Sequence, residues 1–248
     1  QLMKNNFTVV IPARIDSSRL PKKPLLKIGN KSLIQRVCEL AKKVNPTRII
    51  VATDSKKIKD HVEDIGFESI LTSSKHRSGL DRVNEVANKL HFDEDEPILN
   101  IQGDEPFVPI NIIQTVGQSI NKASDICTAS CKFENDEDII NANNVKVVTS
   151  LNGYALYFSR TVIPNRFTKD AHIHYKHIGI YGYTKNILNK LSELDSSSLE
   201  NAEKLEQLRF LENGYKIKVI NFNCHPPIGI DTPEDLKKAN LLIKNEKI

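Results

Sequence analysis

The chain has no tryptophan, a single methionine and only four cysteines among its 248 residues. The cysteines form no C-x-x-C pair and are too sparse for a disulfide framework, which favours a reducing cytosol. No apolar run approaches the roughly 18 residues that a membrane span needs. The first residues also lack the apolar core and small-residue cleavage site of a signal peptide. We therefore expect a cytoplasmic protein with no membrane contact.

Two nucleotide-binding signatures are also missing. Neither G-x-x-x-x-G-K-[ST] nor G-x-G-x-x-G follows the first apolar run, which excludes a P-loop ATPase and an ordinary dinucleotide binder. The net charge of +4, from 35 basic and 31 acidic residues, is too small to imply a sequence-independent grip on nucleic acid. If the chain binds phosphates, side chains must do more of the binding than a glycine-rich backbone.

The first half alternates between short apolar runs and segments with helical spacing. This alternation predicts an α/β fold with a doubly wound, parallel sheet. Connections between the segments are polar or contain proline, as expected of loops. The predicted strands are 7–11, 48–53, 68–71 and 98–101, and the predicted helices are 32–44, 56–65, 80–90 and 110–121.

Beyond residue 125 the pattern becomes richer in strands, which predicts a mixed sheet or a β-rich excursion. Helical periodicity resumes in a leucine stripe over 199–211, which Gly214 ends, and Thr232 is placed to cap a final helix. No linker separates the two halves, so we expect a single domain over 3–248. The predicted strands of this half are 126–133, 145–150, 155–158, 178–183 and 215–222.

The loop after the first strand is strongly basic. Arg14, Arg19, Lys22 and Lys23 lie within ten positions, with Ser17 and Ser18 between them. Ligands of open α/β sheets bind at the carboxyl ends of the strands, and phosphoryl transfer requires neutralised phosphate charge. The loop therefore suits a triphosphate, although on charge alone a solvated surface turn explains it more simply.

Two aspartates could bind a metal ion beside this loop. Asp104 follows the strand at 98–101, and Asp231 precedes the helix cap at Thr232. Magnesium takes one or two protein carboxylates together with substrate phosphates, which this pair could supply. The alternative for the TPED segment is a plain helix cap, which we adopt for Thr232. The histidines His172, His174 and His177 have neither the spacing nor the neighbouring cysteines that favour a zinc site.

A series of motifs runs in order through nearly the whole chain. They are VVIPARIDSSRLPKKPL, RIIVATD, HRSGLDR, NIQGDEPFVP, VKVVTS, GYALYFSR, HIGIYGY, EKLEQLR and IGIDTPEDL. In this order they closely resemble the 3-deoxy-manno-octulosonate (KDO) cytidylyltransferases, or CMP-KDO synthetases. The resemblance implies a Rossmann-like nucleotide-diphospho-sugar transferase fold with a mixed, mainly parallel central sheet. It also implies transfer of CMP from CTP to KDO for lipopolysaccharide synthesis, and a homodimer formed through the β-rich region at about 126–185.

The resemblance assigns roles by matching position, and these assignments are expectations. Catalytic roles and magnesium binding are expected in the loop and at the two aspartates: Arg14, Lys23, Asp104 and Asp231, with Asp104 and Asp231 as the Mg²⁺ ligands. Nucleotide binding is expected of Ala13, Arg14, Arg19, Lys23 and Ser78. Sugar-acid binding is expected of Gln102, Arg160, His177, Tyr181, Glu206 and Gln207. Without the resemblance, Glu206 and Gln207 read as a solvated helix face.

The chain departs from the family pattern in two places. Lys22 stands where glycine is usual, which removes backbone freedom and adds a positive charge. Leu80 and Asp81 stand where threonine and glutamate are common, which removes a hydroxyl near the expected nucleotide site. Three alternatives stay open: a cytidylyltransferase for 8-amino-KDO or another nonulosonic acid, a nucleotide-binding regulatory protein without catalysis, and an RNA-binding protein. For the last, the basic loop lacks neighbouring aromatic side chains for stacking.

Overall fold

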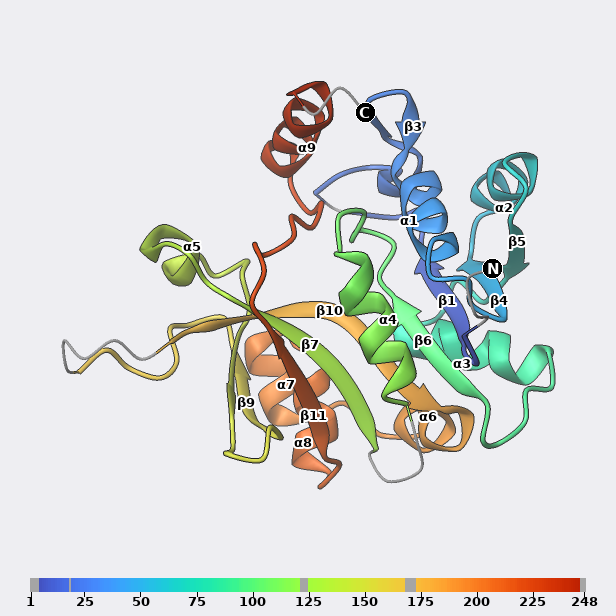
Figure 1. Ribbon diagram of the computed structural model, residues 1–248. Coiled ribbons are helices and arrows are strands. Elements are labelled where there is room, and N and C mark those ends of the chain that lie inside the picture. Colours follow the sequence, from blue (N-terminus) through green and yellow to red (C-terminus); the bar gives the residue numbers. More distant parts are fainter. Residues whose placement is uncertain (1–4, 18, 121–124, 168–172, 246–248) are drawn as a thin grey trace.

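One nine-stranded sheet runs through both halves of the chain in the computed structural model (Figure 1). The structure describes residues 5–17, 19–120, 125–167 and 173–245. Ser18, His172 and the outer ends of the expected domain at 3–248 lie outside the described residues. The main strands, in spatial order, are β11 (Ile217–Phe222), β7 (Ile126–Lys132), β10 (Tyr175–Thr184), β6 (Pro97–Ile101), β1 (Thr8–Ala13), β4 (Arg48–Thr53) and β5 (Glu68–Leu71).

The sheet is mixed but mainly parallel. Strand β10 runs antiparallel to β6 and β7, whereas β1 pairs in parallel with β4 and β6. The hairpin of β8 (Lys146–Thr149) and β9 (Ala155–Ser159) extends from β10. The prediction of a mixed, mainly parallel sheet is confirmed, and the β-rich excursion is an extension of the same sheet.

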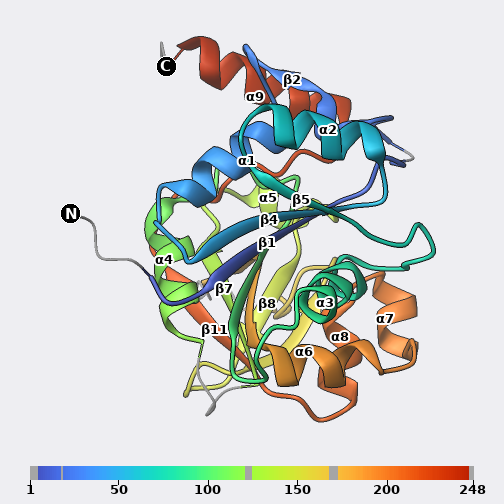
Figure 2. The same cartoon turned by 90° about the vertical axis from the view of Figure 1, so that its right-hand side faces the viewer.

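Helices cover both faces of the sheet (Figure 2). Alternation along β1 explains the two layers, since Val9 and Ile11 belong to one apolar cluster and Val10 to the other. The first cluster includes residues of α1 (Leu33–Lys42), α2 (Lys56–Asp64), α4 (Ile110–Gln118) and α9 (Pro233–Asn245). The second includes residues of α3 (Gly79–Lys89), α6 (Lys185–Ser192) and α8 (Gln207–Glu212).

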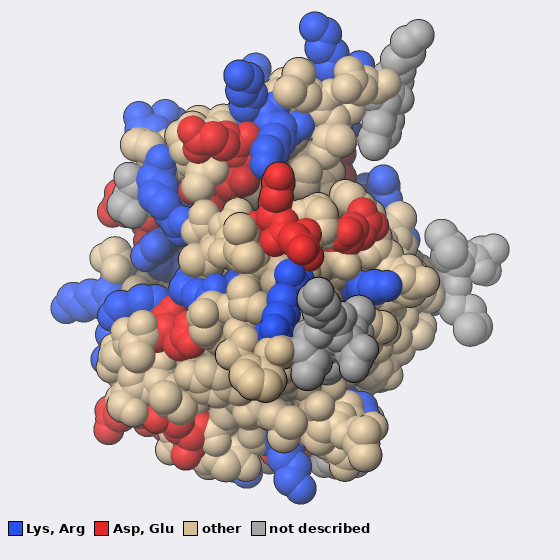
Figure 3. Space-filling view, turned by 90° about the vertical axis from the view of Figure 1, so that its left-hand side faces the viewer, with Lys and Arg blue, Asp and Glu red and all other residues tan. Residues whose placement is uncertain are grey.

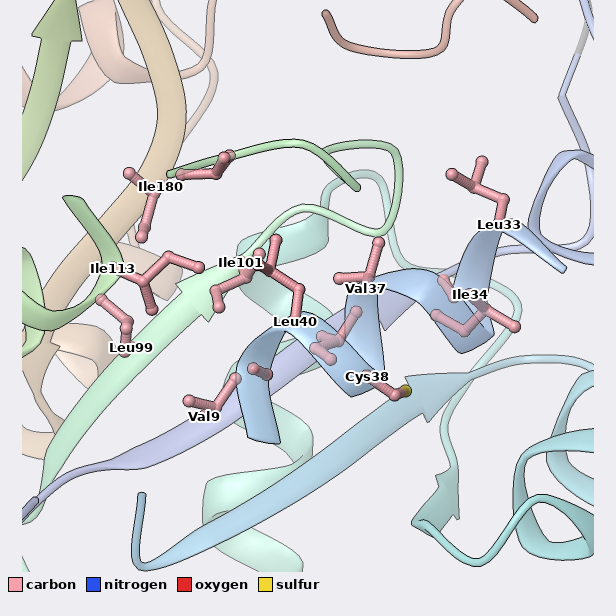
Figure 4. Packing of buried hydrophobic residues seen from close by; sticks show 14 of the residues in the cluster. Val9, Leu33, Ile34, Val37, Cys38, Leu40, Leu99, Ile101, Ile113 and Ile180 are labelled. Atoms are coloured by element: carbon pink, nitrogen blue, oxygen red, sulfur yellow. The ribbon is translucent and has the colours of Figure 1, made fainter. Parts of the chain in front are cut away.

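Helix α1 shows how this packing holds the sheet. Ser32 caps its first turn by accepting a hydrogen bond from Gln35 N, and its apolar side chains are buried against the strands. Figure 4 shows Val37 and Leu40 of this helix on the same side of the sheet as Ile101. Each such side chain contributes about 1.5–3 kcal/mol on burial. The helix therefore holds β1 and β6 in place, and both strands end at the site described below.

The predicted leucine-stripe helix over 199–211 is interrupted, which corrects the sequence-based expectation. Helix α7 (Ser198–Glu203) ends at Lys204, whose φ of 55° is left-handed, and α8 begins at Gln207. A left-handed residue ends a helix because it cannot continue the hydrogen-bond ladder. Leu205 and Leu208 are still buried. The leucine spacing therefore predicted their burial correctly, but it did not show that the helix is broken between them and Leu199.

Five further elements were not predicted. They are the short 3-10 helix at Lys23–Leu25, the two strands of the β2–β3 hairpin (Lys27–Ile28 and Lys31–Ser32), helix α5 (Asp136–Ile140) and helix α6. A disulfide between Cys131 and Cys224 joins the end of β7 to the segment after β11, which the cysteine spacing did not predict either. None of the described helices combines the length and apolar character needed to cross a bilayer.

Candidate active site

A cavity of about 280 Å³ opens at the carboxyl ends of β1 and β6. Its walls are the basic loop after β1, the segment 76–82 at the start of α3, and the turn after β6. The cavity brings together every residue predicted to bind nucleotide or metal, together with Gln102: Ala13, Arg14, Arg19, Lys23, Ser78, Gln102, Asp104 and Asp231.

A close backbone approach shapes the floor of this nucleotide cavity. A Cβ atom on Gly103 would lie 2.8 Å from the carbonyl oxygen of Pro12, so only glycine allows the turn after β6 to pack this tightly against the end of β1. Asp104 follows directly and faces the cavity. The glycine of the QGD segment thus sets the distance between Asp104 and the basic loop.

Lys23 lies between the two aspartates. Its Nζ donates to Asp104 Oδ2 at 2.6 Å and to Asp231 Oδ1 at 3.1 Å. Burial lowers the pKa of Lys23, but the two carboxylates outweigh this effect and hold it above its ordinary value. Arg19 lies 3.6 Å from Asp231 and is more than half exposed. The basic loop is therefore one wall of a charged site, since three of its contacts go to carboxylates.

Asp231 is positioned by the chain on either side of it. Ile230 N donates to the carbonyl oxygen of Asp104 at 2.9 Å, which pins the two aspartate segments together. On the other side Thr232 and Asp235 cap α9, through Asp235 N to Thr232 Oγ1 at 3.2 Å and Thr232 N to Asp235 Oδ2 at 2.9 Å. The capping role predicted for Thr232 is confirmed. The side chain of Asp231 is left to face Lys23.

The donor set at this point suits a hard divalent cation. Two carboxylates converge on one cationic group, and both are partly exposed to the cavity. The described part of the chain holds no cluster of three or more His, Cys, Asp and Glu side chains arranged for a metal. A site of two carboxylates completed by phosphate oxygens and water is the kind that Mg²⁺ favours and that zinc and calcium do not. Asp104 and Asp231 therefore fit the predicted metal.

A second cavity, of about 350 Å³, adjoins the first and shares Arg19 and Asp231 with it. Two residues predicted to bind the sugar acid, Arg160 and His177, line this second cavity, which we call the sugar-side cavity after that prediction. The remaining walls come from α5, the loop before β8 and the segment 225–231. Two adjoining cavities that share a carboxylate and a guanidinium can hold two substrates with their reacting atoms close together.

His177 is held in one tautomer. Thr128 Oγ1 has a single proton, and its shortest contact is with the carbonyl oxygen of Ile180 at 2.6 Å. Thr128 Oγ1 therefore donates its proton to Ile180. It also lies 3.0 Å from His177 Nε2, so in this second contact Thr128 Oγ1 accepts the proton of Nε2. Burial lowers the pKa of His177 to about 3. The ring is therefore neutral at physiological pH, with Nε2 protonated and Nδ1 unprotonated.

Three other residues predicted to bind the sugar acid, Tyr181, Glu206 and Gln207, are not among the residues that line the two cavities. The Tyr181 ring contacts that of His177, with centroids 5.4 Å apart. Glu206 accepts a hydrogen bond from Ser78 and pairs with Arg209, and burial raises its pKa to about 7. Gln207 is buried at the start of α8. Neither Glu206 nor Gln207 is a freely solvated helix residue, and Glu206 is tied to a residue of the nucleotide cavity.

Arg160 is committed to backbone carbonyl groups. Its guanidinium donates to the carbonyl oxygens of Glu203 at 2.8 Å and Ala142 at 3.0 Å. Lys146, fully buried, donates to the carbonyl oxygens of Asn141, Asn144 and Arg160, and burial lowers its pKa to about 8. These bonds brace the wall of the sugar-side cavity, so Arg160 shapes this wall as well as lining it.

Several cavity residues were missed by the sequence reasoning. His76, Arg77 and Arg82 also line the nucleotide cavity, and Glu105 lines its neighbour. Glu105 Oε2 is buried without a hydrogen-bond partner, and burial raises the pKa of this carboxyl to about 8. The signal for both arginines was present, because the motif HRSGLDR carries Arg77 next to Ser78 and Arg82 four positions after it.

Lys22 is not among the residues that line the nucleotide cavity. It is exposed, adopts a left-handed φ of 56°, and lines a separate groove with residues of α2. The φ value explains why the family pattern has glycine here, because side chains disfavour this conformation. The positive charge of Lys22 therefore belongs to this groove and not to the lining of the nucleotide cavity.

We expect Lys22→Gly to leave kcat/KM for the nucleotide within about twofold. Relief of the left-handed strain, about 1–2 kcal/mol, outweighs the extra unfolded-state entropy of glycine, about 0.5–1 kcal/mol. Stability should therefore rise slightly in urea titrations. Lys22→Ala is the matched control, since it removes the charge and keeps the strain. A tenfold loss of kcat/KM in both variants would show that Lys22 does reach the phosphates.

Comparison with known proteins agrees with the geometry. The family model of the cytidylyltransferases matches residues 8–217. A 3-deoxy-manno-octulosonate cytidylyltransferase of Francisella tularensis subsp. novicida (strain U112) is 45% identical over 245 residues, covering 96% of this chain and 98% of that protein. A solved CMP:2-keto-3-deoxy-manno-octonic acid synthetase complexed with CTP is 37% identical, with a TM-score of 0.88 over 97% of this chain and 99% of that one. A putative glucose-1-phosphate thymidylyltransferase from Bacillus anthracis, 18% identical, shares the fold with a TM-score of 0.68 over 96% of each chain.

Proposed function

The chain belongs to the family of the 3-deoxy-manno-octulosonate cytidylyltransferases, and we propose that it transfers CMP from CTP to the anomeric hydroxyl of KDO. The products are CMP-KDO, a precursor for lipopolysaccharide, and pyrophosphate. One observation carries the proposal: the nucleotide cavity and the sugar-side cavity adjoin and share Asp231 and Arg19. The α-phosphate of CTP and the hydroxyl of the sugar acid would meet at this junction.

The reaction needs no covalent enzyme intermediate. The sugar hydroxyl oxygen forms a bond to the α-phosphorus, the bond from that phosphorus to the bridging oxygen breaks, and pyrophosphate leaves with the bonding electrons. The hydroxyl proton passes to solvent. Positioning and charge neutralisation supply the catalysis in such transfers. Arg14, Arg19 and Lys23 would hold the triphosphate, and Ala13 and Ser78 would frame the nucleoside.

Asp104 and Asp231 would hold magnesium between the two substrates. When bound, Mg²⁺ would polarise the α-phosphate and lower the pKa of the attacking hydroxyl. Lys23 now bonds to both carboxylates. A cation held by the aspartates would leave the ammonium group of Lys23 for the phosphates, where it offsets the charge that develops on the departing pyrophosphate.

The sugar acid would be recognised by neutral and charged partners from several strands. Gln102 lies at the nucleotide cavity, while His177 and Arg160 line the neighbouring one. The acceptor at His177 Nδ1 suits a sugar hydroxyl, and Tyr181, Glu206 and Gln207 complete the proposed pocket. A polyhydroxylated acid needs donors and acceptors of this kind, because an apolar pocket could not discriminate its hydroxyl groups.

Pyrophosphate release tests the proposal directly. Purified protein with CTP and magnesium should release pyrophosphate with KDO, and mass spectrometry should detect CMP-KDO. Parallel reactions with 8-amino-KDO and neuraminate define the substrate, and CTP without a sugar acid is the blank. Release with KDO no greater than with neuraminate would remove the substrate assignment, and CTP binding without turnover would favour a regulatory protein.

We also propose that the chain acts as a single-domain homodimer in the cytoplasm. The shared sheet supports one domain. Large apolar side chains are exposed around the β8–β9 hairpin, including Leu151 and Leu156, and Phe167 is exposed farther along the chain. Figure 3 shows the side of the molecule on which β9 and α5 lie in Figure 1, where acidic and basic side chains are interspersed with uncharged ones. The exposed apolar group suits a subunit interface, and sedimentation velocity would measure the mass of the assembly.

A further inference from the structure

A buried ion pair lies at the wall of the nucleotide cavity, which Arg82 lines and Asp54 does not, and it has no assigned role in the proposed chemistry. Arg82 NH2 donates to Asp54 Oδ2 at 3.0 Å, and their side chains are 4% and 10% exposed. Asp54 directly follows β4, the parallel neighbour of β1, and Ala13 at the end of β1 is in register with Thr53. The register therefore places the Asp54 carboxylate beside the first residues of the basic loop.

The other oxygen of Asp54 reaches the loop itself. Asp54 Oδ1 accepts a hydrogen bond from Ile15 N at 3.1 Å. Ile15 follows Arg14, one of the residues proposed to hold the triphosphate. One carboxylate thus fixes the backbone at the base of the basic loop with one oxygen and binds Arg82 with the other.

Arg82 carries the connection to the opposite wall of the cavity. Its NH1 donates to Thr72 Oγ1 at 2.5 Å and to the carbonyl oxygen of Ser73 at 3.3 Å. Ser73 N in turn donates to Glu85 Oε2 at 2.8 Å. The segment after Ser73 carries His76, Arg77 and Ser78, which line the cavity. The ion pair therefore connects the basic loop to the segment that faces it.

We propose that Asp54 and Arg82 are positioning residues that set the separation and orientation of the two walls that bind CTP. The inference rests on the proposed function and deepens it. Arg82 acts through Asp54 and the 72–78 segment, since its NH1 and NH2 groups already donate to protein oxygens. The pair should govern CTP binding and have little effect on the sugar acid, whose cavity it does not line.

Asp54→Ala tests the connection to Ile15. A hydrogen bond between a backbone amide and a carboxylate is among the stronger ones, so we expect KM for CTP to rise about tenfold or more, with KM for KDO within about twofold of wild type. Asp54→Asn keeps an oxygen acceptor for Ile15 N and should raise KM for CTP less. Calorimetric titration with CTP gives the same comparison without turnover, so it remains informative if KDO is not the substrate.

A second variant shows whether Asp54 acts on CTP binding by positioning the basic loop or only by stabilising the folded protein. Asp54→Ala leaves Arg82 buried and unpaired, which is destabilising, whereas removal of both charges largely restores stability. The double variant Asp54→Ala/Arg82→Met should therefore regain thermal stability but keep the raised KM for CTP, because the acceptor for Ile15 N is still missing.

The Arg48–Glu68 ion pair provides the matched control. It lies at the other end of β4, with Arg48 NH2 2.6 Å from Glu68 Oε1, and both side chains are 39% exposed. Glu68→Gln should leave both KM values unchanged. The proposal is overturned if KM for CTP in Asp54→Ala stays within twofold of wild type. It is equally overturned if the double variant regains the wild-type KM along with its stability.

Discussion

Asp104→Asn is expected to lower kcat/KM about a thousandfold or more while the fold stays intact. The substitution removes one of two carboxylates that would hold magnesium and the shorter of the two contacts of Lys23, at 2.6 Å. Losing a group that stabilises transition-state charge typically costs about 10²–10³-fold, and a metal ligand acts on several charges at once. Pyrophosphate release under saturating CTP and magnesium measures the loss.

Three measurements make this result specific. Circular dichroism should be unchanged, because Asp104 is partly exposed and the turn is held by backbone contacts, including Ile230 N to the carbonyl oxygen of Asp104. Mn²⁺ titration in the presence of CTP should show weaker metal binding. Glu234→Gln, an exposed carboxylate three positions after Asp231, is the control and should retain full activity. Activity of Asp104→Asn within tenfold of wild type would exclude a role in metal binding.

Lys23→Met is expected to lower kcat/KM by about 10²–10³-fold, since it removes a cation that would stabilise charge on the leaving pyrophosphate. It should also change the response of stability to magnesium. Without Lys23, Asp104 and Asp231 are left without the cation that both of them now contact, and their repulsion lowers the melting temperature in EDTA. Magnesium bound at the two carboxylates then stabilises the folded state by mass action.

Thermal melts in EDTA and in MgCl₂ would measure this effect apart from activity. The magnesium-induced rise in melting temperature should be larger for Lys23→Met than for wild type. Lys27→Met, which removes an exposed lysine from the same segment, should behave as wild type in both assays. Equal magnesium responses in all three proteins would contradict a cation site shared by Asp104 and Asp231.

The spacing of apolar residues predicted much of the fold, because buried side chains recur at one interval in a strand and at another in a helix. Strands β4 and β5 and the start of α2 lie where the apolar spacing placed them. The same signal failed at Lys204, because leucines on both sides of a break can still point into the core. It also missed α6, and the Cys131–Cys224 disulfide joins residues 93 positions apart, which no local pattern reports.

For the candidate site, too, the sequence indicated some of the residues, whereas the structure was needed to show their contacts. Arg14, Lys23, Asp104 and Asp231 could be chosen from the sequence, because their motifs resemble those of a family and follow predicted strands. Their convergence on one cavity required the structure. Asp54 followed a predicted strand just as Asp104 did, yet nothing in the sequence indicated that its carboxylate would join Ile15 to Arg82. The partners of a side chain depend on strand register, which is set by packing over the whole sheet.

For this protein the sequence by itself determined the α/β class, the family and the residue types that could hold a triphosphate and a divalent cation. The spacing of apolar residues and the order of the motifs depend only on neighbouring positions in the chain, so no three-dimensional structure is needed to recognise them. Only the tertiary structure decided that Lys23 lies between Asp104 and Asp231, that Lys22 lines a separate groove, and that two cavities share Asp231. These arrangements join segments up to 208 positions apart, and such contacts form only when the sheet brings its carboxyl ends together.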